Sequence, residues 1–215
     1  MKVETLLVTP FMQNARILWS EKSKRGVVVD PGGEAEIILE ALERLGVTCE
    51  AIWLTHSHLD HCGAVAPLIE KLKVPLYAHP AERIMRSKVV EISRMYGLPD
   101  GILFNCPEPD HEIVGGEVLQ IDGESCKVLF TPGHAPGHVC FYFKELGELI
   151  AGDTVFAGAI GRTDLPGGDY DTLISSIRTE ILSLPDETII RSGHGPDTTV
   201  GAERKTNPFL MRGAA

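Results

Sequence analysis

The sequence predicts an α/β protein organised as a four-layer αβ/βα sandwich, in which two sheets carry helices on their outer faces. Strand-like and helix-like segments are mixed in both halves of the chain, and no long linker or low-complexity stretch divides them. In addition, short segments that contain histidine and aspartate directly follow several predicted strands. We therefore expect one domain over residues 1–215, with a functional site at the strand ends.

The chain opens with three predicted strands over residues 3–8, 15–19 and 27–29, which are rich in aliphatic and β-branched side chains. Pro10 separates the first two strands, and the charged turn over 21–25 separates the last two. Connections this short join antiparallel neighbours, so an antiparallel start to the first sheet is expected.

Apolar residues at a helical period predict a helix over 34–45, which Gly46 ends. The apolar run 51–54 predicts a strand, and 63–72 reads as a second amphipathic helix. A further strand is expected over 74–78. The histidine-rich segment thus lies between a strand and a helix, where α/β proteins commonly place ligands.

The second half repeats this mixture of strands and helices. The predicted elements are an irregular helix over 80–96, strands over 117–121, 126–130, 139–143, 148–151 and 188–190, and a helix over 170–182. Short turns over 122–124 and 144–147 predict that the strands on either side of each turn pair as hairpins. Proline and glycine mark 99–110 and 158–169 as loops.

Composition and charge argue against several functional classes. With 43% apolar residues, 215 residues are enough to bury a core. The net charge of −10 and the pI near 5.2 disfavour nucleic-acid and anionic-membrane partners. No run approaches the ~18 apolar residues of a membrane span, and the start Met1–Glu4 is unlike a signal peptide.

The five cysteines are scattered and contain no C-x-x-C pair. Neither a disulfide framework nor a thiolate zinc site is therefore indicated. This cysteine usage suits the reducing cytoplasm, which is the expected location.

Four potential metal ligands lie within the segment Thr55–His61, namely His56, His58, Asp60 and His61. In an extended segment residues i and i+2 point to the same side. His56 and His58 can therefore converge on one ion, while Asp60 and His61 turn toward a neighbouring one. A single histidine in a loop is normally a solvated side chain, but this clustering favours metal binding.

Three later strand ends add His134, Asp153 and His194. Zinc and iron(II) accept imidazole nitrogen and carboxylate oxygen, and a catalytic centre keeps one coordination position open. Spacing alone leaves open which of these three residues joins which ion.

The ordered segments T-H-S-H-L-D-H, P-G-H, G-D and G-H-G resemble the metallo-β-lactamase superfamily over nearly the whole chain. This resemblance implies the αβ/βα sandwich and a dinuclear centre. It assigns the first ion to His56, His58 and His134, the second to Asp60, His61 and His194, and a bridging role to Asp153. Within the superfamily, Gly161–Gly168 and Ser192–Pro196 are similar to the short bacterial hydroxyacylglutathione hydrolases, the type II glyoxalases.

The resemblance implies hydrolysis of a small-molecule thioester such as S-lactoylglutathione by a metal-bound hydroxide. Two divalent ions would be required, with zinc ahead of iron and manganese. Asp60 would additionally orient the attacking hydroxide and is the expected catalytic residue. The oligomeric state is not predicted.

Longer type II glyoxalases add a helical C-terminal domain that supplies basic residues to the glutathione carboxylates. The 21 residues after His194 are too few to form that domain. The remaining basic candidates are Arg162, Arg204 and Lys205, of which Arg162 is favoured for substrate binding.

Two other functions stay open. A mononuclear iron persulfide dioxygenase resembles the same family and would use a triad equivalent to His56, His134 and Asp153. The hydrolase is preferred because a complete second ligand set is present and because Pro166–Gly168 is more similar to the hydrolases. A non-catalytic structural metal protein is disfavoured, since structural zinc sites are usually rich in thiolates.

Four other polar residues receive ordinary interpretations. His79, His111 and His138 lie outside the ligand positions and are expected to be loop or partly buried histidines. Asp30 is expected to accept loop hydrogen bonds or to support the site from behind.

Overall fold

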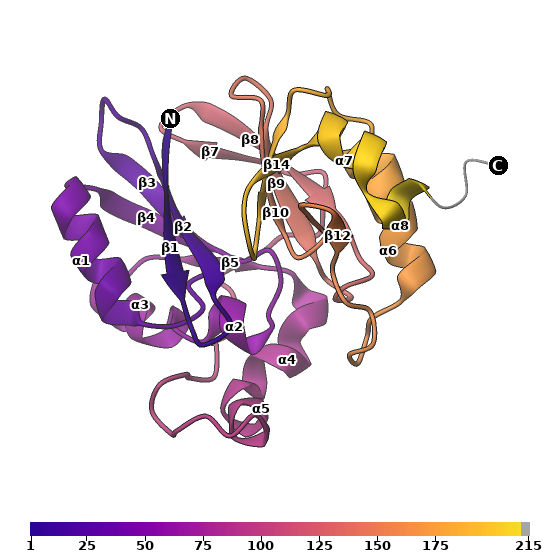
Figure 1. Ribbon diagram of the computed structural model, residues 1–215. Coiled ribbons are helices and arrows are strands. Elements are labelled where there is room, and N and C mark those ends of the chain that lie inside the picture. Colours follow the sequence, from indigo (N-terminus) through magenta and orange to yellow (C-terminus); the bar gives the residue numbers. More distant parts are fainter. Residues whose placement is uncertain (212–215) are drawn as a thin grey trace. The chain divides into compact units, whose positions relative to one another are not determined.

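The computed structural model describes residues 1–211. The chain forms two compact units. The first unit comprises Met1–Ile113 and Gln120–Glu124, and the second comprises Val114–Leu119 and the chain from Ser125 onward. Each unit contains one six-stranded sheet with helices, so the predicted mixture of strands and helices in both halves is present (Figure 1).

The sheet of the first unit has the order β1-β2-β3-β4-β5-β6. Its strands are β1 (Lys2–Val8), β2 (Gln13–Trp19), β3 (Arg25–Val29), β4 (Thr48–Trp53), β5 (Leu76–Ala78) and β6 (His111–Glu112). The first three strands are antiparallel, as predicted, and β3 to β6 are parallel. Val29 and Trp53 are register partners, so β3 and β4 end side by side and bring the residues after them together.

The helices of the first unit are α1 (Ala35–Leu45), α2 (Leu59–Cys62), α3 (Val65–Leu72), the 3-10 turn η1 (Pro80–Glu82), α4 (Arg83–Ser87) and α5 (Val89–Met95). Ile38 and Leu42 of α1 are buried in one core with β-strand residues such as Ile17 and Val28. Gly46 ends α1 in the left-handed conformation, with φ of 66°, as its position predicted.

The histidine-rich segment differs from the predicted loop because its second part is the single helical turn α2. Leu59 and Cys62, three residues apart, are both buried in the core of the first unit. This shared buried face stabilises a turn that carries Asp60 and His61 in its middle.

The sheet of the second unit has the order β14-β13-β10-β9-β8-β7, and β11 and β12 form a separate hairpin. The strands are β7 (Val118–Ile121), β8 (Glu124–Phe130), β9 (Val139–Phe143), β10 (Glu148–Gly152), β11 (Val155–Phe156), β12 (Ala159–Ile160), β13 (Ile189–Ser192) and β14 (Thr198–Thr199). Strand β9 is antiparallel to both β8 and β10, and β10 is parallel to β13. Strands β8, β10 and β13 therefore run in one direction and end at the same edge of the sheet.

The helices of the second unit are α6 (Tyr170–Ser176), the π-helix η2 (Ile177–Ile181), α7 (Val200–Thr206) and α8 (Pro208–Met211). The predicted helix over 170–182 thus changes from α to π, with the Leu182 N–H bonded to the Ile177 carbonyl. Leu173, Ile177 and Ile181 are all fully buried in one core. The wider π turn keeps these side chains on the buried side of the helix.

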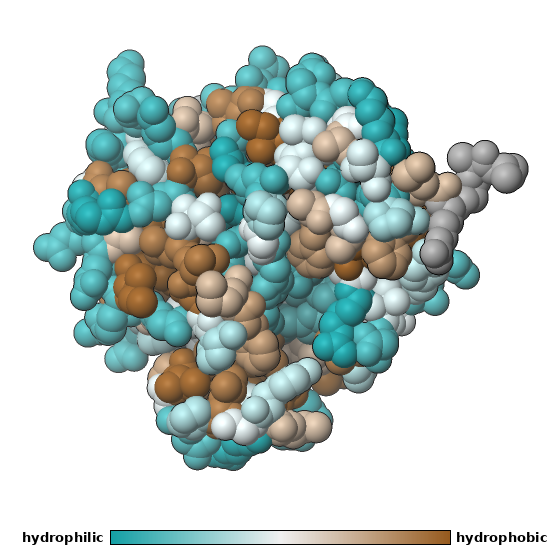
Figure 2. Space-filling model, viewed as in Figure 1, coloured by the Kyte–Doolittle hydropathy of each residue, from teal (hydrophilic) through white to brown (hydrophobic). Residues whose placement is uncertain are grey.

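An apolar hollow of about 480 Å³ lies in the first unit, between the start of α1, Pro67 of α3 and the loop carrying Ile102 and Phe104. Figure 2 shows brown, hydrophobic surface over this part of the molecule. Among residues 1–211, no helix combines the length and hydropathy needed to cross a membrane.

Candidate metal centre

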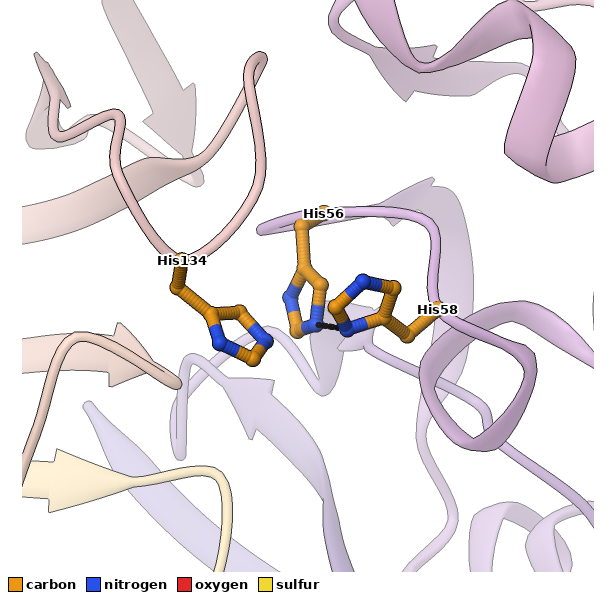
Figure 3. A group of neighbouring side chains, drawn as sticks. All are labelled: His56, His58 and His134. Carbon is orange, nitrogen blue, oxygen red and sulfur yellow. Dashed lines mark hydrogen bonds between the residues drawn. The ribbon is translucent and has the colours of Figure 1, made fainter. Parts of the chain in front are cut away.

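In the first unit, the histidines after β4 form a buried cluster. The His56 Nε2 and His58 Nδ1 atoms lie 3.1 Å apart, and Figure 3 shows the two rings turned toward each other. The ring centroids of His56 and His61 are 4.1 Å apart. All three side chains are buried, so the structure confirms that His56 and His58 converge.

Asp30 supports this cluster from the end of the neighbouring strand β3. Its carboxylate accepts hydrogen bonds from the Thr55 N–H at 2.7 Å and the Thr55 hydroxyl at 2.6 Å, and it lies 3.0 Å from His61 Nδ1. Asp30, His56 and His61 offer ligand atoms within 4.8 Å of one another. Because Asp30 already contacts Thr55 and the His61 ring, it fits the predicted supporting role.

Glu82 is a second buried carboxylate beside the cluster. Its Oε2 atom accepts a hydrogen bond from the Ser57 N–H at 3.2 Å, and Ser57 lies between His56 and His58. The side chain is fully buried. Sequence reasoning missed this residue because a glutamate in an irregular helical segment is ordinarily solvent-exposed.

Asp60 is half-buried in the first turn of α2. Gly32 packs directly against its backbone, since a Cβ atom at residue 32 would lie 1.5 Å from the Asp60 carbonyl oxygen. This glycine, three residues after β3, therefore allows the close approach of α2.

In the second unit, three separate segments bring the later predicted ligands together. His134 follows β8, Asp153 follows β10 and His194 follows β13, the three strands that end at one sheet edge. Asp153 Oδ2 lies 3.7 Å from His134 Nε2 and 3.5 Å from His194 Nε2. One carboxylate oxygen thus lies between two imidazole nitrogens.

His134 is oriented by the glycine-rich loop after β12. Its Nδ1 atom donates to the Arg162 carbonyl at 2.7 Å, which turns Nε2 toward Asp153. Gly161 makes this approach possible, because a Cβ there would lie 1.9 Å from the Asp153 carbonyl oxygen.

The Arg162 side chain, predicted to bind substrate, is about half exposed and makes a two-bond ion pair with Asp164, at 2.7 and 2.8 Å. Hydrogen bonding to Arg162 lowers the pKa of Asp164 to about 2. The pair is therefore charged at neutral pH.

His138 lies closer to this site than the sequence indicated. The ring is fully buried, and its Nε2 atom accepts a hydrogen bond from the Asp153 N–H at 3.1 Å. His79 and His111, by contrast, lie outside the ligand clusters, as expected.

Both clusters fit a borderline divalent metal ion. In a tetrahedral zinc centre, metal–ligand bonds of about 2.0–2.1 Å place neighbouring ligand atoms roughly 3.3–3.4 Å from one another. The ligand-atom separations within the units, 3.1 Å in the first and 3.5 and 3.7 Å in the second, bracket that value. Imidazole nitrogen and carboxylate oxygen are donors that zinc, iron and manganese all accept.

Comparison with known proteins places these features in a family. A model described as the metallo-β-lactamase superfamily matches residues 8–194. A Haemophilus influenzae protein named hydroxyacylglutathione hydrolase GloC is 41% identical over 212 residues, which are 98% of each chain.

Two solved structures are each 40% identical to this chain. The B3 metallo-β-lactamase BLEG-1 has a TM-score of 0.89, and the match covers 98% of this chain and 100% of that one. The protein TTHA1623, described in a di-iron-bound form, has a TM-score of 0.87 with coverages of 96% and 100%.

Proposed function

The chain belongs to the metallo-β-lactamase superfamily as a metallo-hydrolase with the fold of that family, and from this premise we propose that it hydrolyses small-molecule thioesters of the S-lactoylglutathione type. The observation that carries the proposal is the position of Asp153 Oδ2 between His134 and His194, together with the buried histidines after β4. The end-to-end likeness to a named hydroxyacylglutathione hydrolase supports the substrate class.

The proposal requires two divalent ions, of which zinc is the first choice. The first ion would be held by His56, His58 and His134, the second by Asp60, His61 and His194, with Asp153 shared by both. When bound, the ions would lower the pKa of a coordinated water and polarise the scissile carbonyl.

The supporting residues keep the imidazoles in the tautomers that metal binding needs. A ligating histidine normally donates its other ring N–H to a carboxylate or a backbone carbonyl. Asp30 at His61 Nδ1 and the Arg162 carbonyl at His134 Nδ1 are such partners. In both rings Nε2 is then the proposed ligand atom.

The reaction needs no nucleophilic serine or cysteine. Water adds its oxygen to the thioester carbonyl carbon and gives up one proton, the C–S bond breaks, and the departing thiolate takes up one proton, so the products are the carboxylic acid and the free thiol. Asp60 is proposed to orient the attacking water. The five cysteines are buried and unbridged, which agrees with a structural role for them and with the proposed cytoplasmic location.

Arg162 is proposed to contact a carboxylate of the substrate. Its guanidinium is about half exposed and paired with Asp164. A substrate carboxylate would therefore have to displace the Asp164 carboxylate from the Arg162 guanidinium. The overall charge of −10 fits small substrates better than nucleic acid or an anionic membrane.

The test is an activity comparison on purified protein whose metal content has been determined. We expect hydrolysis of S-lactoylglutathione with two metal ions per chain, and a loss of at least about 100-fold in kcat for Asp60→Ala. The matched control is His111→Ala, at an exposed position outside both clusters, which should keep full activity. Oxygen consumption with glutathione persulfide and one iron per chain would instead identify a dioxygenase.

β-Lactam hydrolysis is a second candidate function, favoured by the 40% identity to the B3 metallo-β-lactamase BLEG-1. A chromogenic cephalosporin assayed beside the thioester separates the two candidates. A kcat/KM for the cephalosporin above that for S-lactoylglutathione would replace the thioesterase proposal.

A further inference from the structure

His138 is a fully buried side chain that the proposed reaction leaves without a role. It lies immediately before β9, at the sheet edge where β8 and β10 end. Both ring nitrogens are engaged within the second unit: Nε2 is 3.1 Å from the Asp153 backbone nitrogen, and Nδ1 is 3.0 Å from the Thr131 hydroxyl.

These contacts determine the tautomer of the ring. A backbone N–H can only donate, so Nε2 must be the accepting, unprotonated nitrogen. Nδ1 then carries the proton and donates it to the Thr131 hydroxyl. The Thr131 hydroxyl lies 3.3 Å from the Cys140 sulfur, which in turn donates to the Ala151 carbonyl at 3.4 Å. A directed chain of buried hydrogen bonds therefore links the Asp153 N–H to the residue two positions before it.

The Asp153 backbone needs such a partner because the sheet ladder is irregular there. The β10–β13 register shifts between Ile150 and Gly152, and Gly152 has a left-handed φ of 50°. The Asp153 N–H therefore points to an acceptor outside the ladder, and an unsatisfied buried N–H would cost stability. Rotation of this peptide would also move Oδ2 away from His134 and His194.

We propose that His138 is a positioning residue, which fixes the Asp153 peptide so that the Asp153 carboxylate is presented between His134 and His194 for metal binding. The inference rests on the proposed function in so far as Asp153 is a metal ligand. His138 itself contacts neither substrate nor reacting atoms; it acts through the backbone of Asp153.

The experiment compares His138→Leu, which removes the acceptor, with His138→Gln, whose side-chain oxygen can replace Nε2 as acceptor. Chelator competition gives the Zn²⁺ affinity of each variant. The visible absorption spectrum of each Co²⁺-loaded protein reports the geometry of the metal site. The kcat and KM are measured for S-lactoylglutathione hydrolysis. Unfolding of the metal-free proteins reports folding, and His111→Leu is the control for loss of a histidine.

For His138→Leu we expect metal affinity about 10- to 100-fold weaker, the range typical when a partner of a ligand is removed, with an altered Co²⁺ spectrum. The kcat should fall while KM stays within about twofold, because the substrate contacts are unchanged. His138→Gln should recover most of the affinity and the wild-type Co²⁺ spectrum.

Two outcomes would overturn the proposal. One is wild-type Zn²⁺ affinity and Co²⁺ spectrum in His138→Leu, whatever its stability. The other is an equal loss of affinity in the leucine and glutamine variants. If His138→Leu does not fold, Thr131→Val tests the same chain, because it removes the hydroxyl that accepts from Nδ1–H and contacts the Cys140 sulfur, while the His138 ring stays in place; wild-type metal affinity in that variant would count against the proposal.

The two proposals can fail separately. The wild-type protein could lack thioesterase activity while His138→Leu still weakens metal affinity and His138→Gln still restores it. That result would remove the proposed substrate and keep the role of His138. Full thioesterase activity and metal affinity in His138→Leu would do the reverse.

Discussion

The two units build their ligand clusters in different ways. In the first unit the histidines lie within one seven-residue segment after β4, and buried carboxylates, Asp30 and Glu82, support them. In the second unit His134, Asp153 and His194 come from three strand ends that are far apart in sequence. Their supports are electrically neutral: a backbone carbonyl for His134 and the ring of His138 for Asp153.

The difference shows that the first cluster is supported by charged side chains and the second by the arrangement of the backbone. In the first unit a carboxylate fixes the tautomer of His61 and adds negative charge near the proposed second ion. The cluster of the second unit consists of His134, Asp153 and His194, so its carboxylate is the proposed ligand Asp153 itself, and the position of Asp153 depends on strand order. The first cluster should therefore respond most to a change of charge at Asp30, which contacts a histidine directly, and the second to changes of backbone packing.

The largest effect is expected from Gly161→Ala in the second unit. The new Cβ would lie 1.9 Å from the Asp153 carbonyl oxygen, so the loop or the ligand strand must move. We expect loss of at least about 100-fold in kcat/KM, measured with S-lactoylglutathione, because small displacements of catalytic groups are costly. Gly158→Ala is the control: its Cβ meets nothing within 4 Å, and only its φ of 76° is strained. Equal activity losses in both variants would contradict the packing argument.

The second-largest effect is expected from Asp30→Asn in the first unit. The substitution keeps the size of the side chain but removes the charge beside His61 and replaces one acceptor oxygen with a donor. We expect the weaker of the two bound metal ions to dissociate about 10- to 100-fold more readily, measured by chelator competition. Retention of both ions with wild-type affinity would show that charge is not what supports this cluster.

A smaller effect is expected from Glu82→Leu, which removes the acceptor of the Ser57 N–H. An unsatisfied buried donor costs about 1–3 kcal/mol, so the midpoint of denaturant unfolding should fall. Activity should fall by about tenfold or less, because no ligand loses its own partner. Glu82→Gln keeps an acceptor oxygen, so its unfolding midpoint should lie nearer to that of the wild type than the midpoint of Glu82→Leu does. A lower midpoint in Glu82→Gln than in Glu82→Leu would contradict the hydrogen-bond argument and point to the charge of Glu82 instead.

The smallest effect is expected at the exposed pair of Arg162 and Asp164. Removing the competing carboxylate in Asp164→Asn should lower KM for S-lactoylglutathione by about two- to fivefold without changing kcat, since exposed ion pairs are weak. Arg162→Ala should raise KM. An unchanged KM in both variants would remove Arg162 from the substrate site.

The same pair makes a pH prediction. Hydrogen bonding to Arg162 lowers the pKa of Asp164 from 3.8 to about 2. The contribution of the pair to folding is therefore present above pH 3.8 and is lost as the pH falls through about 2. NMR titration of the Asp164 carboxyl should show its midpoint return toward 3.8 in Arg162→Ala.

Much of the fold could be predicted because local patterns determine it. The antiparallel opening, the helix ended by Gly46 and the strand before Thr55 follow from periodicity and turn residues, and the structure contains all of them. The change from α to π at Ile177 was not predictable, since it depends on how Leu173, Ile177 and Ile181 reach the core. Secondary-structure propensity carries no signal for that fit.

Parts of the candidate site were accessible to sequence analysis and parts were not. The convergence of His56 and His58 follows from their spacing. The roles of Glu82 and His138 depend on backbone N–H groups that lie 25 and 15 residues away, at Ser57 and Asp153. For Arg162 the sequence drew attention to the side chain, whereas the structure gives the backbone carbonyl a partner in His134. The metal-ligand assignments themselves stay predictions until the metal content is measured.

The burial of all five cysteines makes the protein a convenient scaffold for site-specific labelling. Burial raises the pKa of Cys49 to about 11 and that of Cys126 further still. At pH 8 a thiol with a pKa of 11 is ionised in about one molecule in a thousand, so maleimide reagents should leave it largely unmodified. A single cysteine introduced on the surface could then carry a fluorophore or spin label against a low background, with no native cysteine removed.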